Sequence, residues 1–146
     1  MNRKCDDMTE KELNRVRNLK KKIEREAERV AGTRRAITDL VPFLDGMPHA
    51  QNQSSRVEKL TAQIVDGERR LDELKDEMAA EAAALTAEIS RAPLNRQEHD
   101  VIMLRYVTCL NFRDIEFRLN YSDANVFYHH RNGTKKLFGK IPFDSD

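Results

Sequence analysis

Apolar residues recur every seven positions in two separate stretches of the chain. The first series is Val16, Ile23, Val30, Ile37 and Leu44, and the second is Val57, Ile64, Leu71, Met78 and Leu85. The seam positions between them are uneven: Leu19, Leu40, Leu60 and Leu74 are apolar, whereas Glu26, Gly67, Glu81 and Glu88 are not. A seven-residue apolar repeat with charges elsewhere is typical of helices that pack in a coiled-coil manner. The pattern therefore predicts two long helices.

Local signals set the ends of these helices. Thr9 with Glu12, and Ser55 with Glu58, each match the capping box, in which two side chains satisfy unpaired backbone N–H groups of the first turn. The segment DGMPHAQNQ, residues 45–53, is rich in turn residues and follows a proline, which cannot continue a helix interior. The predicted helices are about 9–40 and about 55–91.

The two predicted helices differ in charge. Residues 3–35 hold twelve Lys or Arg against seven Asp or Glu, a net charge of +5, whereas residues 55–91 hold six against nine, a net charge of −3. Opposite charges on helices joined by a short loop favour an antiparallel hairpin. Two other interpretations stay open. In one, the charges form only a solvated face, since exposed ion pairs contribute little to stability. In the other, Lys20, Lys21 and Lys22 contact nucleic acid.

The predicted helices become shorter after Pro93. This proline disfavours helix at the residue before it and marks the expected boundary between two modules. Three helices are predicted beyond this boundary. The first begins at Asn95 and carries Val101, Leu104 and Val107; the second is capped by Asn111 and carries Phe112, Ile115 and Leu119; the third is capped by Ser122. Asn120 and Tyr121 separate the last two helices, and Asn tolerates the left-handed backbone of a tight turn. This order predicts a helix-turn-helix.

The predicted fold class is therefore all-α, a long antiparallel, coiled-coil-like hairpin followed by a three-helix module. The predicted divisions are a hairpin over 1–91, a helix-turn-helix domain over 92–140 and a tail over 141–146. The seam residues Val16, Ile23, Ile64 and Leu71 exceed what one thin hairpin can shield, because two helices bury only facing stripes. We expect a homodimer, which pairs the third helices of two chains.

The third helix of the module has two distinct sides. One side is expected to pack inward and holds Val126, His130, Gly133 and Leu137. The opposite side holds Ala124, Tyr128, Arg131 and Lys135, flanked by Asn125 and Asn132. Residues 121–140 carry a local net charge of +3. The outward side therefore offers hydrogen-bond donors for bases and phosphates, and an aromatic edge.

The stretch LNRQEHDVIMLRYVTCLNFRDIEFRLNYSDANVFYHHRNGTKKL, residues 94–137, resembles region four of bacterial sigma factors. The matching pieces are Leu94, the run Val101–Tyr106, Asp114-Ile115, Leu119, Tyr121-Ser122, Val126 and Lys135-Lys136-Leu137. The whole chain is similar in architecture to small sigma-like proteins of phages and prophages of Gram-positive bacteria, related to the ArpU and RinA type of late-gene transcription regulators. The resemblance implies promoter DNA binding through the third helix, and contact with RNA polymerase.

The outward side and the resemblance together define the expected DNA-contacting residues. They are Arg113, Ser122, Asp123, Asn125, Tyr128, His129, Arg131, Asn132, Lys135 and Lys136. The sequence departs from the family pattern in three places. Glu116 replaces a small residue where two helices cross, Asn120 replaces the turn glycine, and His129 or His130 falls on an apolar position. A carboxylate at a close crossing must turn outward or widen the crossing angle.

Other chemistry has weaker support in the sequence. Adjacent residues on a helix point about a hundred degrees apart, so His129 and His130 do not suit one metal ion. We expect His130 to be a hydrogen-bonded, partly buried histidine, and Cys109 to be a small buried hydrophobe. No glycine-rich phosphate loop is present. We expect neither an enzyme nor a bound metal or cofactor.

Composition adds little to this interpretation. The chain is 39% hydrophobic and 35% charged, and has a net charge of +1. No apolar run reaches the ~20 residues of a membrane span, and the N-terminus lacks the apolar core of a signal peptide, so we expect a cytoplasmic protein. Two alternative functions stay open: a DNA-recognition subunit of the small-terminase type from phages, and an adaptor protein with a degenerate helix-turn-helix that does not bind DNA.

Overall fold

The computed structural model describes residues 9–43 and 50–138, and these residues are helical nearly throughout, with no strand among them. The elements are α1 (Glu10–Leu13), α2 (Arg15–Leu40), the short 3-10 helix η1 (Val41–Phe43), α3 (Ala50–Arg91), α4 (Arg96–Ile102), the π-helix η2 (Met103–Val107), α5 (Phe112–Leu119) and α6 (Asp123–Leu137). The predicted all-α class is confirmed. Leu44 of the predicted seam and the predicted tail lie outside the described residues.

The ends of the long helices differ from prediction in two places. Thr9 and Glu12 form the expected capping box, but α1 ends after one turn, and Asn14 separates it from α2. The second helix begins at Ala50, so Ser55 lies inside α3 and does not cap it. Residues 50–54 extend a helix that downstream packing has already nucleated, because each added residue then gains a backbone hydrogen bond at little cost.

The described chain divides into two compact units, one of residues 21–77 and the other of residues up to 20 together with those from 78 onward. The predicted boundary after residue 91 therefore does not coincide with this division. The reason is packing: Leu13, Val16, Leu85 and Ile89 share a buried core with side chains of the C-terminal helices. The start of α2 and the end of α3 thus belong to the same compact unit as the C-terminal helices.

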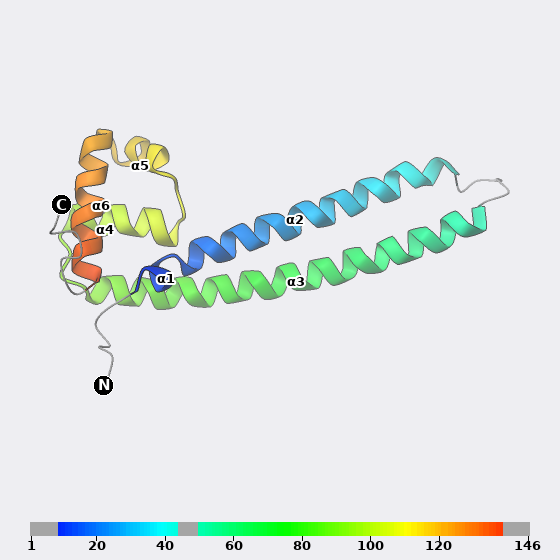
Figure 1. Cartoon of the computed structure of the whole chain (residues 1–146), viewed down its shortest axis with the longest axis horizontal. Coiled ribbons are helices and arrows are strands. Elements are labelled where there is room, and N and C mark those ends of the chain that lie inside the picture. Colours follow the sequence, from blue (N-terminus) through cyan, green and yellow to red (C-terminus); the bar gives the residue numbers. More distant parts are fainter. Residues whose placement is uncertain (1–8, 44–49, 139–146) are drawn as a thin grey trace. The chain divides into compact units, whose positions relative to one another are not determined.

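Within residues 21–77, α2 and α3 lie side by side and run in opposite directions (Figure 1), since Glu26 pairs with Arg70 and Arg34 pairs with Glu68. Gly67 makes this approach possible: a Cβ added there would lie 2.5 Å from Cγ2 of Val30, far inside normal contact. The glycine that interrupts the apolar seam is therefore the notch that receives Val30.

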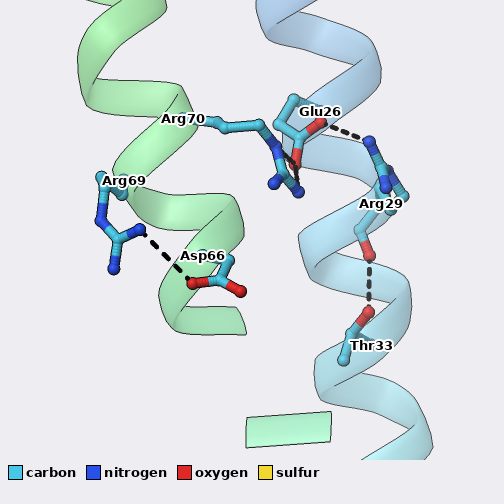
Figure 2. Close-up of polar contacts among 6 residues, drawn as sticks. All are labelled: Glu26, Arg29, Thr33, Asp66, Arg69 and Arg70. Atoms are coloured by element: carbon cyan, nitrogen blue, oxygen red, sulfur yellow. Dashed lines mark hydrogen bonds and ion pairs between the residues drawn. The ribbon is translucent and has the colours of Figure 1, made fainter. Parts of the chain in front are cut away.

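Glu26, another of the irregular seam residues, is only 7% exposed and is held by two arginines (Figure 2). Arg70 donates from Nη2 and Nε to Oε2 at 2.8 and 3.2 Å, and Arg29 donates from Nη2 to Oε1 at 2.8 Å. The Arg70 hydrogen bonds hold the pKa of Glu26 below its usual value. A buried carboxylate needs such partners. The charges at this level therefore serve to pair α2 with α3 in one register.

The other unit contains two apolar cores. The larger core holds Leu13, Val16, Leu85, Ile89, Ile102, Tyr106 and Leu137. The smaller core consists of Val101, Ile115 and Val126, each fully buried, with one residue from each of α4, α5 and α6. The predicted inward faces of the three short helices are thus confirmed at these positions. Together the two cores position α6.

Candidate nucleic-acid interface

The backbone before α6 is shaped by short polar side chains, as the sequence predicts. Asn120 adopts the left-handed conformation, with φ 60° and ψ 44°, and the N–H groups of Asn120 and Tyr121 both donate to the carbonyl of Glu116. Ser122 then caps α6, because its Oγ accepts a hydrogen bond of 3.1 Å from the Asn125 N–H. The turn therefore sets where the first residues of α6 point.

The inward side of α6 is tightly fitted to α4. A Cβ added at Gly133 would lie 2.8 Å from Cγ1 of Ile102, so the helix backbones approach closely there, as predicted. Lys136 donates from Nζ to Oε1 of Glu98 at 2.7 Å, and the Glu98 side chain is only 4% exposed. The same carboxylate oxygen accepts from the N–H of Asn95. Lys136, which the sequence assigned to DNA, thus tethers α6 to the start of α4.

His130 is the hydrogen-bonded, partly buried histidine that the sequence predicts. Its Nε2 lies 2.6 Å from the hydroxyl oxygen of Tyr106. Its ring packs edge-on against the ring of Phe112, with 5.1 Å between the ring centroids. Burial, together with the nearby positive charges of Arg105 and Arg17, lowers the pKa of His130 from 6.5 to about 4. The neutral imidazole therefore belongs to the packing of α6 against η2, and it offers no charge to a ligand at neutral pH.

The outward side of α6 brings most of the predicted contact residues together. Asn125, Tyr128 and Arg131 are exposed, and Asn132 and Lys135 are half-buried. Ser122 and Asp123 are exposed at the start of the helix. Hydrogen-bonding amides, an aromatic ring and two basic groups thus share one helix face. These are the groups that proteins use on base edges and phosphates.

His129 lies at the border of this face, between two tyrosines. Its ring centroid is 5.8 Å from that of Tyr121 and 5.3 Å from that of Tyr128. Its Nδ1 is buried and, within the described part of the chain, has no hydrogen-bond partner. Such unpaired buried polar atoms are uncommon in folded proteins. The side chain is half-buried, so it is less available to a ligand than the sequence predicts.

Arg113 lies apart from the α6 residues, beside an open hollow of about 450 Å³ on the surface of α5. The hollow is lined by Arg113, Asp114, Glu116, Phe117, Asn120 and Tyr121. Glu116 has therefore turned outward, and the smaller core beneath it remains fully buried. Sequence reasoning missed Phe117, which is 92% exposed. The signal was available, since Phe117 falls opposite Ile115 and Leu119 on α5.

The remaining features offer weaker sites. A second hollow, of about 280 Å³, lies beside Glu26, but its arginines Arg29 and Arg70 already bind that carboxylate. Among the residues that the structure describes, no group of three or more His, Cys, Asp or Glu could hold a metal ion. The same residues include no helix long and apolar enough to cross a membrane.

Cys109 occupies a special backbone position at the end of η2. Its φ is 66°, and it lies half-buried against the larger core, close to the predicted role of a small buried hydrophobe. The Leu110 N–H donates to the Leu104 carbonyl across this residue, which closes the π-helix and redirects the chain toward α5.

The chain matches no protein-family model, and no curated protein or solved structure matches it.

Proposed function

We propose that this protein is a DNA-binding transcriptional regulator of the sigma-region-four-like type, encoded by a phage or prophage. In this proposal α5, the turn at Asn120 and α6 form a helix-turn-helix, preceded by a long antiparallel hairpin of α2 and α3. The protein acts in the cytoplasm as a homodimer on double-stranded DNA, in contact with RNA polymerase.

The observation that carries the proposal is the difference between the two sides of α6. Its inward side is fixed to α4 by Gly133 and Lys136, whereas its outward side leaves Asn125, Tyr128 and Arg131 exposed. A recognition helix needs this combination, because its N-terminal residues must reach base edges while the rest of the helix keeps its orientation.

The two ends of α6 have different roles in this proposal. Asn125 and Tyr128, near the start, lie where a recognition helix meets base edges in the major groove. Arg131 and Lys135, one and two turns later, meet phosphates. Phosphate contacts strengthen binding to all sequences, and base contacts distinguish one sequence from another.

The test compares two substitutions by fluorescence anisotropy at several salt concentrations, first on random duplex DNA and then on the fragment the protein selects from its own genome. Lys135→Ala should weaken binding to all duplexes alike and reduce the salt slope by about one unit. Asn125→Ala should cost about 1–3 kcal/mol on the selected fragment and little on random DNA. Lys75→Ala, an exposed lysine of α3, is the matched control.

Two outcomes would contradict the proposal. If both α6 substitutions leave binding unchanged while replacement of Lys20, Lys21 and Lys22 by Ala abolishes it, the helix pair holds the nucleic acid. If no duplex DNA binds at low salt, the protein is an adaptor and the face of α6 has another use.

A further inference from the structure

Phe117 projects from α5 without contributing to either core. It is 92% exposed, whereas Ile115 on the same helix is fully buried. A single exposed apolar residue is common on protein surfaces, but this one borders the hollow of about 450 Å³ that Tyr121 also lines. Two aromatic rings therefore flank one open hollow, and one of them is almost wholly available to a ligand.

The other side chains around the hollow are all able to hydrogen-bond. Arg113 and Asn120 can donate, and Asp114 and Glu116 can accept. The two carboxylates make the hollow unsuitable for a phosphate. They suit the exocyclic amino groups of bases, because Asp and Glu accept from such groups. Aromatic walls with polar groups for the edge are what proteins use to hold an unstacked base.

The hollow is connected to the outward side of α6 by a line of rings. Tyr121 borders the hollow and contacts His129, which in turn contacts Tyr128. The buried Nδ1 of His129, without a partner in the described chain, lies within this line. Arg131 lies one turn beyond Tyr128 on α6, and its positive charge suits the phosphate backbone of a bound strand.

We infer that the hollow on α5 binds an unstacked base of single-stranded DNA, adjacent to the duplex that α6 contacts. Phe117 and Tyr121 stack on the base, and the carboxylates of Asp114 and Glu116 accept hydrogen bonds from its amino group. Cytosine and adenine, which carry exocyclic amino groups, are therefore preferred over thymine. This inference rests on the proposed nucleic-acid binding by the module, and it adds the class of ligand at a second place on it.

The test uses fluorescein-labelled 12-nucleotide strands of dC, dA or dT and a 12-base-pair duplex, with binding followed by anisotropy at fixed salt. Stacking on one aromatic side chain contributes about 1–3 kcal/mol, so Phe117→Ala should weaken binding of the dC strand roughly 5- to 150-fold. Val65→Ala, which truncates another half-exposed apolar side chain, on α3, is the control and should leave binding unchanged. Because Phe117 is outside both cores, its removal should leave the circular dichroism spectrum intact.

A second variant tests the base preference. Glu116→Gln replaces a pure acceptor by an amide that also donates, so the ratio of dC to dT affinity should fall toward one. If the Phe117→Ala variant binds the dC strand as tightly as the wild-type protein does, the inference is overturned, even if Lys135→Ala weakens duplex binding as proposed. Equal affinity of the wild-type protein for dC and dT strands would contradict the part of the inference in which the carboxylates select the base. If neither strands nor duplex bind, the proposed function and this inference both fail.

Discussion

Adding one methyl group at Gly67 should show how closely α2 and α3 approach. In an exposed helix interior, Gly→Ala stabilises by about 0.5–1 kcal/mol, because glycine has greater freedom in the unfolded chain. At Gly67 the new Cβ would lie 2.5 Å from Cγ2 of Val30 and 3.2 Å from Oε2 of Glu26. Carbon atoms normally approach to about 3.5–4.0 Å, so the helices must separate or the side chains must move.

The expected size follows from these distances. Overpacking of a fitted contact costs about 1–3 kcal/mol, which exceeds the gain in helix propensity. The matched control is Gly32→Ala on α2, where the nearest atom to the new Cβ is 3.7 Å away at the end of the Arg35 side chain. We expect Gly32→Ala to stabilise and Gly67→Ala to destabilise, with about 1–3 kcal/mol between the two variants.

Urea denaturation followed by circular dichroism measures the free energy of unfolding of both variants. A double-mutant cycle with Val30→Ala identifies the cause, since that change removes the methyl group that the new Cβ meets. The double variant should be more stable than the sum of the single effects predicts, by about 0.5–3 kcal/mol. If Gly67→Ala stabilises as much as Gly32→Ala, or if the cycle shows no coupling, then Gly67 is not the notch for Val30.

Three further predictions concern α6 and the turn that precedes it. His130 has a folded pKa of about 4 against 6.5 in the unfolded chain, so the stability due to its neutral form is present above pH 6.5 and is lost as pH falls to about 4. It amounts to at most about 3 kcal/mol, and His130→Phe should remove this part of the pH dependence of unfolding in urea. Lys136→Met should cost about 1–3 kcal/mol by leaving the buried Glu98 with fewer partners, whereas Lys135→Met should cost little; equal costs would contradict the tether. At the left-handed Asn120, Ala should lower the melting temperature by an amount that reflects about 1–2 kcal/mol and Gly should not, and similar effects of both would contradict the role of this backbone conformation.

The amino-acid sequence alone was sufficient for features that depend on neighbouring residues. Thr9, Asn95, Asn111 and Ser122 each cap a helix as their side chains predict, and Asn120 makes the left-handed turn. These signals act within about four residues, because a cap or a turn hydrogen bond joins groups that are close in the chain. The two faces of α6 were predictable for the same reason, since helical periodicity alone assigns them.

Other features depend on residues that are distant in the chain. Glu26 and Arg70 are 44 residues apart in the sequence, and Glu98 and Lys136 are 38 residues apart. No local pattern distinguishes such a pair from charges on a solvated surface. The structure begins α3 at Ala50, so Ser55 lies inside the helix although its local pattern predicts a cap. Phe117 was visible as an apolar residue on the outer side of α5, but the hollow beside it exists only because Asn120 brings Tyr121 back toward that helix. Capping and periodicity therefore gave the helices and their faces, whereas pairing and cavities arise only when separate helices meet.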